Sequence, residues 1–135
     1  MKKVLVFGTF DRLHPGHLSF LKQAKKYGQL FVLVARDQTV EKMKRKKPQQ
    51  KARRRINEIK KTGLATKVFL GNLKNKYLSL KKIRPDTICL GYDQVFFIKN
   101  LPKKIKEFSL KTKIIRLKAY KPNIYKSSKL SIATK

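Results

Sequence analysis

Short runs of apolar residues recur along the chain and alternate with longer stretches in which apolar positions follow a helical period. Such runs are typical of strands buried on both faces of a parallel sheet, and the amphipathic stretches are typical of the helices that cover it. The pattern predicts an α/β fold, with a parallel sheet of about five strands flanked by helices in a single domain over residues 1–135. The expected strands are residues 4–7, 30–35, 67–70, 87–90 and 113–117, and the expected helices are residues 15–27, 52–61, 77–83 and 101–108.

The first expected strand leads directly into the sequence GTFDRLHPGH, residues 8–17. A strand, a tight turn and a helix start bring the first N–H groups of the helix, and the positive end of its dipole, to the carboxyl edge of the sheet. The two histidines of the chain, His14 and His17, lie three positions apart at this helix start, so their imidazoles face the same way. The arrangement predicts an anion site that suits a phosphate group.

Two other interpretations of the histidine pair stay open at this point. Histidines spaced as HxxH also serve as zinc ligands, but zinc needs a third or fourth ligand and the single cysteine, Cys89, lies in a different apolar run. The other interpretation is a purely structural pair. The strand, turn and helix around the histidines favour the anion site over both.

The spelling GTFDxLHxGH resembles the signature of the HxGH nucleotidyltransferases. It is most similar to their cytidylyltransferase-like branch, which includes the glycerol-3-phosphate cytidylyltransferases and the archaeal-type FAD synthases. The resemblance covers the chain from Gly8 to Lys129 and implies a Rossmann-like domain in which His14 and His17 contact the phosphates of a nucleotide. It also implies that the nucleotide is bound by the other residues of the motif, namely Gly8, Thr9, Phe10, Pro15 and Gly16.

The resemblance further implies roles for two carboxylates. Asp11 in the motif and Asp37 after the second expected strand are expected near the acceptor substrate or its metal. From the residues alone, Asp37 is also a possible N-cap, since a helix could begin at Thr39. Both roles stay open for Asp37.

A basic stretch at residues 42–51, broken by Pro48, is expected to be a loop. Most such stretches are solvated surface. In the family that the chain resembles, a lysine-bearing loop at this place closes over the triphosphate, and an arginine at the start of the next helix lies near the phosphates. The candidates are Lys44, Lys46 and Lys47 for the loop, with Lys46 or a neighbour on the leaving pyrophosphate, and Arg55 for the helix start.

Two later segments are most similar to the archaeal-type FAD synthases. GYDQ, residues 91–94, follows the fourth expected strand, and in those enzymes its aspartate lies near the sugar and base of the nucleotide. YKSSK, residues 125–129, replaces the arginine-containing spelling of the cytidylyltransferases, and its serines are expected to start a final helix that holds phosphates. An aromatic wall at Tyr120 suits an adenine ring. The implied nucleotide-binding residues of these segments are Gly91, Asp93, Tyr120, Lys121, Ser127 and Ser128.

The net charge of +29, from 36 Lys and Arg against 7 Asp and Glu, is extreme for a chain of 135 residues. A surface this basic attracts polyanionic substrates, binds nucleic acid, or simply remains well hydrated, and charge alone does not choose among these. We expect nucleic-acid binding to be weak and non-specific at most.

A single cysteine excludes an intrachain disulfide framework and is typical of a reducing compartment, so Cys89 is expected to be a small buried apolar residue. No apolar stretch approaches the ~20 residues that a membrane-spanning helix needs. The N-terminus leads straight into a strand with no signal-peptide pattern. We expect a soluble, cytoplasmic protein with no membrane partner.

The resemblance as a whole implies transfer of an adenylyl group from ATP to FMN, giving FAD and pyrophosphate. Mg²⁺ or another divalent cation would be bound with the triphosphate, with no direct protein ligand assured, and the family's frequent homodimers imply a homodimer here. The alternatives are a cytidylyltransferase that forms CDP-glycerol or a similar CDP-alcohol from CTP, and a basic nucleic-acid-binding protein on the same scaffold. The chain has no GxxxxGK[ST] loop, so a kinase of that kind is not expected.

Overall fold

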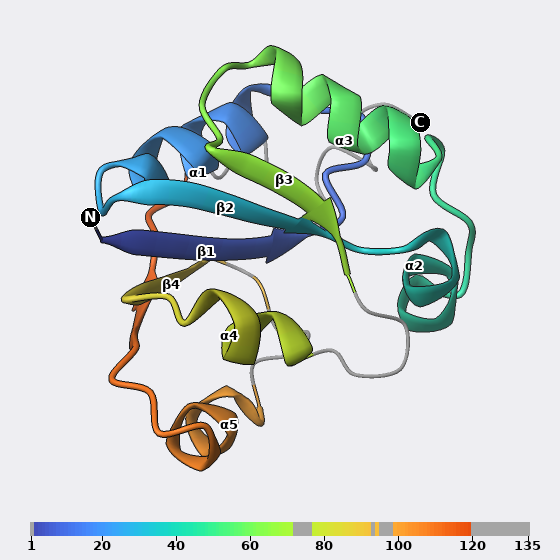
Figure 1. The fold of residues 1–135 in the computed structure, drawn as a ribbon. Helices are drawn as coiled ribbons and strands as arrows, with labels where there is room; N and C mark the ends of the chain where they lie inside the picture. The colour runs from blue at the N-terminus through green and yellow to red at the C-terminus, as the bar shows by residue number, and fades with distance from the viewer. Residues whose placement is uncertain (1, 72–76, 93, 95–98, 120–135) are drawn as a thin grey trace.

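The computed structural model describes residues 2–71, 77–92, 94 and 99–119, and five parallel strands of this part form one sheet (Figure 1). The spatial order is β3-β2-β1-β4-β5, and every neighbouring pair is parallel. This confirms the predicted Rossmann-like α/β fold. The strands are β1 (Lys3–Gly8), β2 (Gln29–Val34), β3 (Lys67–Leu70), β4 (Thr87–Leu90) and β5 (Lys113–Arg116).

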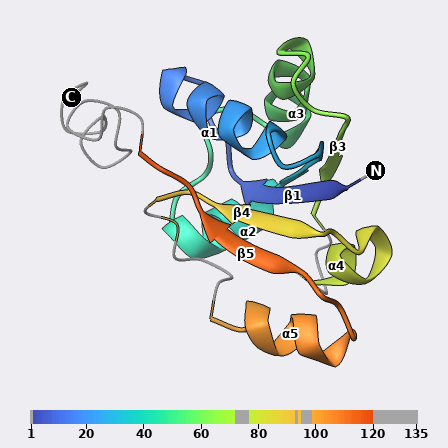
Figure 2. The same ribbon diagram turned by 90° about the vertical axis from the view of Figure 1, so that its left-hand side faces the viewer.

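Helices cover both faces of the sheet. α1 and α3 lie on one face and α4 and α5 on the other, while α2 lies beyond the carboxyl ends of β1 and β2 (Figures 1 and 2). This layering explains why the apolar runs have no polar face, since both sides of the central strands are packed against helices. The helices are α1 (Pro15–Lys25), α2 (Asp37–Lys44), α3 (Ala52–Lys61), α4 (Leu78–Ile83) and α5 (Leu101–Glu107).

The core has one cluster on each face of the sheet, and alternate residues of β1 serve the two clusters. Val4 and Val6 pack with residues of α1 and α3, whereas Leu5 and Phe7 pack with residues of α4 and α5. Val4, Leu5 and Val6 have no exposed surface. Since each fully buried aliphatic side chain contributes roughly 1.5–3 kcal/mol, β1 is held firmly from both sides.

The expected boundaries of the strands and helices agree with the structure to within a few residues. The first helix is shorter than expected and ends at Lys25, before Gly28 turns the chain with a φ of +150°. A Cβ at Gly28 would lie 2.4 Å from the carbonyl oxygen of Lys2, so only glycine fits this turn. Cys89 is buried as expected, and its burial raises the pKa of the thiol to about 12.

Two expectations around α2 are corrected. The stretch 42–51 is not all loop, because α2 continues to Lys44 and the chain turns at Arg45 in the left-handed region, with a φ of +57°. Asp37 is not the N-cap of α2. Arg36 is the N-cap, and Asp37 is the first residue of the helix. The final helix expected near Ser127 lies outside the described residues.

The strand order creates a switch point between β1 and β4. From β1 the chain proceeds through β2 to β3 on one side, and β4 and β5 are added on the other side. Open α/β sheets bind ligands at such a point, at the carboxyl ends of the strands. The turn that contains the histidines and the turn after β4 both lie at this edge. No helix among the described residues is long and apolar enough to cross a membrane.

Candidate active site

The turn after β4 is joined to β1 through Gln94. Its side-chain oxygen accepts a hydrogen bond from the backbone N–H of Gly91 (3.1 Å), and its side-chain nitrogen donates to the carbonyl of Phe7 (3.3 Å). Arg116 on β5 also donates through Nη1 to the carbonyls of Gly91 (2.7 Å) and Gln94 (3.0 Å). The turn after β4 is therefore fixed relative to the end of β1.

His14 and His17 form the N-terminal cap of α1. The Nδ1 atom of His14 accepts a hydrogen bond from the N–H of Gly16 (3.0 Å), and the Nδ1 atom of His17 accepts one from the N–H of His14 (3.3 Å). This is the reciprocal pattern of a capping box, made here by two imidazoles. The rings stack with their centroids 3.8 Å apart and their planes 25° from parallel.

The cap determines which ring nitrogen carries the proton. A neutral imidazole has one donor and one acceptor nitrogen, and both Nδ1 atoms are acceptors here. The proton of each neutral ring therefore sits on Nε2, which becomes a hydrogen-bond donor. The histidine pair offers two N–H groups beside the start of a helix, as expected of a phosphate site.

Both rings are neutral at physiological pH. Burial lowers the pKa of His17 to about 3, with smaller contributions from His14 and from the positive charge of Lys44. Burial also lowers the pKa of His14. The pair is thus a set of neutral hydrogen-bond donors with no positive charge of its own. Of the three candidate lysines, Lys44 is the one whose charge acts on His17.

Phe10 packs against His17, and Gly8 leaves space for the Phe10 ring. The Phe10 ring is buried and meets the His17 ring edge-on, with centroids 5.6 Å apart. A Cβ at Gly8 would lie 2.6 Å from Cε2 of Phe10, so the glycine makes room for the ring. In the structure Phe10 packs against His17 and Gly8 makes room for Phe10, while the nucleotide-binding role that the resemblance implies for both stays a prediction.

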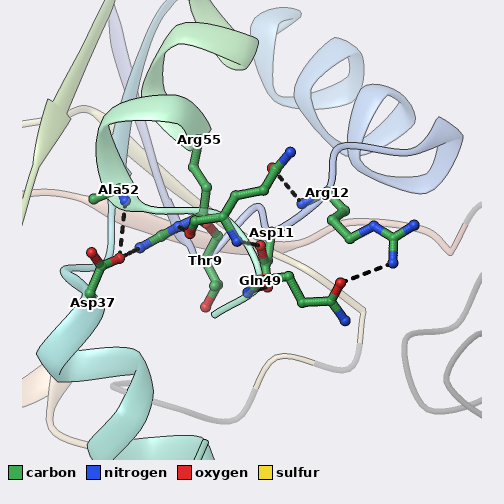
Figure 3. Close-up of polar contacts among 8 residues, drawn as sticks. Thr9, Asp11, Arg12, Asp37, Gln49, Ala52 and Arg55 are labelled. Carbon is green, nitrogen blue, oxygen red and sulfur yellow. Dashed lines mark hydrogen bonds and ion pairs between the residues drawn. The ribbon is translucent and has the colours of Figure 1, made fainter. Parts of the chain in front are cut away.

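Arg55 is buried, and each of its three guanidinium nitrogens donates a hydrogen bond (Figure 3). Nη1 donates to the carbonyl of Thr9 (2.8 Å), Nε to the carbonyl of Gln50 (2.9 Å) and Nη2 to Oδ1 of Asp37 (2.7 Å). The side chain of Arg55 has no exposed surface. This geometry favours a positioning role for Arg55 over the expected direct contact with pyrophosphate.

The two carboxylates expected near the acceptor or its metal are bound to the protein itself. Oδ1 of Asp37 accepts from Arg55 and also from the N–H of Ala52 (3.0 Å), so Asp37 caps α3 rather than its own helix. Asp11 accepts the N–H groups of Gln49 (2.7 Å) and Gln50 (2.9 Å) with its two oxygens. Among the described residues, no group of three or more His, Cys, Asp or Glu side chains could hold a metal ion.

Several residues of the site were missed from the sequence: Gln49, Gln50, Gln94 and Arg116. An amide between two turns carries no sequence signal of its own, although Gln94 lies within the GYDQ segment. Thr9, Pro15, Gly16 and Gly91 lie in the two turns at the switch point, and their expected role in nucleotide binding stays a prediction. The remaining expected residues, namely Asp93, Tyr120, Lys121, Ser127 and Ser128, lie outside the described residues.

A family model described as cytidylyltransferase-like matches residues 5–131. The chain belongs to the cytidylyltransferase-like family. Within it, the chain is 43% identical over 118 residues to a protein of Methanohalophilus mahii named FAD synthase, covering 87% of this chain and 82% of the relative. It is 44% identical over 125 residues to a FAD synthase of Methanobrevibacter smithii, covering 89% and 81%. These similarities confirm the family inferred from GTFDxLHxGH.

Solved structures agree with the cytidylyltransferase-like assignment. A protein of Thermoplasma volcanium, titled a lipopolysaccharide core biosynthesis protein, has a TM-score of 0.82 and 36% identity, covering 89% of this chain and 98% of that one. A pantoate-beta-alanine ligase of Francisella tularensis has a TM-score of 0.62 at 19% identity, covering 86% and 58%. The second likeness shows the fold alone.

Proposed function

We propose that this member of the cytidylyltransferase-like family is an FMN adenylyltransferase, which transfers an adenylyl group from ATP to FMN and releases pyrophosphate. The observation that carries the reaction type is the pair of neutral imidazoles whose Nε2–H groups stand at the start of α1. The choice of substrates is supported by the relatives named FAD synthase, at 42–44% identity over most of the chain.

The reaction needs charge stabilisation and alignment, with no covalent step on the enzyme. A phosphate oxygen of FMN attacks the α-phosphorus of ATP, a new P–O bond forms, and the bond from that phosphorus to the bridging oxygen breaks with its electron pair going to pyrophosphate. FMN carries its phosphate as an anion at neutral pH, so no side chain has to remove a proton. Negative charge grows on the phosphoryl oxygens and on the leaving group.

We assign these charges to groups at the carboxyl edge of the sheet. The Nε2–H groups of His14 and His17 would donate to phosphate oxygens, together with the first N–H groups of α1. Fixed neutral donors require no loss of a proton and no reorientation as the charge develops. Lys44, whose charge already acts on His17, would lie on the triphosphate, with Lys46 and Lys47 close by in the chain.

The family implies a divalent cation, but the described residues do not form a site for it by themselves, since both Asp11 oxygens and one Asp37 oxygen accept N–H groups. We therefore propose that Mg²⁺ arrives with the triphosphate. Adenine recognition by Tyr120 and Asp93, and phosphate contacts by Lys121, Ser127 and Ser128, remain predictions from the sequence. The expected homodimer also stays a prediction, which light scattering of the purified protein checks.

The test is a turnover assay with Mg²⁺ in which the purified protein meets ATP plus FMN in one reaction and CTP plus glycerol 3-phosphate in another, with products identified by mass spectrometry. We expect FAD and pyrophosphate from the first mixture only, and a third mixture of ATP and riboflavin should give no FMN. Formation of CDP-glycerol but no FAD would show that the proposed substrates are wrong and that the reaction is still a nucleotidyl transfer. No product from either mixture would overturn the proposal.

A further inference from the structure

Four hydrogen bonds tie the turn before His14 to the loop that carries the lysines. We call residues 45–51 the basic loop. The N–H groups of Gln49 and Gln50 donate to the two carboxylate oxygens of Asp11 at 2.7 and 2.9 Å. In return, the backbone N–H of Arg12 donates to Oε1 of Gln50 (2.9 Å), and Nη1 of Arg12 donates to Oε1 of Gln49 (3.0 Å; Figure 3). We call these four bonds the Asp11 clamp.

The clamp is specific in its chemistry. Two consecutive backbone N–H groups meet the two oxygens of one carboxylate, and hydrogen bonds to an ionised acceptor are stronger than those between neutral groups. An asparagine at position 11 would have one oxygen, and its NH2 group would oppose the second N–H. The geometry thus requires an acid at this position.

Gln50 is held from three directions. Its N–H donates to Asp11, its side-chain oxygen accepts from Arg12, and its carbonyl accepts from Nε of buried Arg55. The other end of the basic loop is fixed by α2, which ends where Arg45 adopts a φ of +57°. Between these two ends lie the exposed side chains of Lys46 and Lys47. Their position relative to the histidine turn is therefore set by the clamp.

We propose that Asp11 is a positioning residue, which holds the basic loop in the register that presents its lysines to the bound triphosphate. This rests on the proposed function. Asp11 lies three residues before His14, so one turn of chain both displays the histidines and locates the lysines. The role also explains how a carboxylate is compatible with an anion site: both of its oxygens face N–H donors.

The first experiment observes the clamp itself, without any turnover. Amide hydrogen exchange at Gln49 and Gln50, followed by NMR, should accelerate about tenfold or more in an Asp11→Asn variant, since a lost charge-assisted hydrogen bond corresponds to at least that factor. Asp86→Asn is the matched control. Asp86 is an exposed carboxylate that accepts the N–H of Lys3 (2.8 Å) at the other end of β1, and its loss should leave Gln49 and Gln50 unchanged. Unaltered exchange in Asp11→Asn would overturn the clamp.

The second experiment is a double-mutant cycle in triphosphate affinity, measured by calorimetry. Asp11→Asn should raise the Kd about tenfold in the wild-type background, but less than twofold when Lys46 and Lys47 of the basic loop are both replaced by alanine. Gln50→Ala, which removes only the acceptor of the Arg12 N–H, should act in the same direction with a smaller effect. Thermal unfolding of each variant confirms that it is folded.

Equal effects of Asp11→Asn in both backgrounds would mean that Asp11 contacts the ligand or its metal directly, and would overturn the positioning role. The cycle uses whichever nucleoside triphosphate the wild-type protein binds, so a wrong choice of substrates does not affect it. Binding of no triphosphate by the wild-type protein would count against both proposals. Normal triphosphate binding by the wild-type protein, with equal effects of Asp11→Asn in both backgrounds, would count against the role of Asp11 alone.

Discussion

Each side of the switch point is held by its own arginine, and the two arginines lie in opposite environments. Beside β1, Arg55 has no exposed side-chain surface and joins the histidine turn, the basic loop and α2. Beside β4, Arg116 is exposed and contacts Gly91, Tyr92 and Gln94 of the turn after β4 through a single nitrogen. A buried guanidinium must have all its partners, whereas an exposed one has water as an alternative. The histidine side should therefore be the rigid half of the site.

This difference predicts unequal costs for removing the two arginines. Arg55→Ala leaves the carbonyls of Thr9 and Gln50 without this donor and removes the ion pair with Asp37, whose Oδ1 keeps only the N–H of Ala52, so we expect the free energy of unfolding to fall by about 3 kcal/mol. Arg116→Ala should cost less than about 1 kcal/mol, because water replaces the donor. Urea unfolding measures both. Arg54→Ala, an exposed neighbour on α3, is the control and should change little. Equal losses for Arg55 and Arg116 would contradict the comparison.

The capping role and the proposed phosphate role of His14 are separable by one substitution. In a His14→Asn variant, the side-chain oxygen takes the place of Nδ1 and still caps α1, but there is no counterpart of Nε2–H. We expect turnover to fall by ~100-fold, as for the loss of one preorganised donor, while the midpoint of urea unfolding stays close to that of the wild type. His14→Ala loses the cap as well and should cost about 1 kcal/mol of stability. Full activity of His14→Asn would remove His14 from the site.

The third prediction concerns the pH dependence of stability, which distinguishes a neutral His17 from a charged one. The pKa of His17 is about 3 in the folded protein, below its ordinary value near 6.5. Below pH 6.5 His17 is protonated in the unfolded chain but stays neutral in the folded chain. The contribution of His17 to the free energy of unfolding is therefore full above pH 6.5 and falls as the pH drops toward 3. The slope contributed by one such group is at most ~1.4 kcal/mol per pH unit.

The measurement is the difference in unfolding free energy between the wild type and a His17→Asn variant from pH 7.5 to 4.5. That difference should be constant above pH 6.5 and should shrink or reverse below it. Wild-type stability that increases on acidification relative to the variant would show that His17 is charged in the folded state, against the neutral pair described above.

The sequence predicted the sheet and the site turn because their causes are local. Apolar runs mark buried strands, and a strand followed by Pro15 and Gly16 marks a helix start. Arg53, Arg54 and Arg55 look alike in the sequence, yet only Arg55 is buried. A signal was present: Arg55 lies four residues before buried Ile59, so both share the inner face of α3.

The partners of Asp11 could not be predicted in the same way. The Asp11 clamp joins residues 38 and 39 positions apart, and the path of the chain between them depends on how α2 docks at the edge of the sheet. The resemblance to the family implied that Asp11 lies near the acceptor substrate or its metal. The structure shows that each oxygen of Asp11 already accepts a backbone N–H, which only the fold could reveal.

The reciprocal cap at the start of α1 also bears on the fraction of molecules ready to react. An unconstrained neutral histidine divides its population between two tautomers, and an enzyme that needs one of them loses part of its effective concentration to the other. Here the hydrogen bonds that start the helix select the Nε2–H form of both rings. Every molecule that has formed α1 therefore has both rings in the Nε2–H form, so folding of the helix and selection of the tautomers occur together.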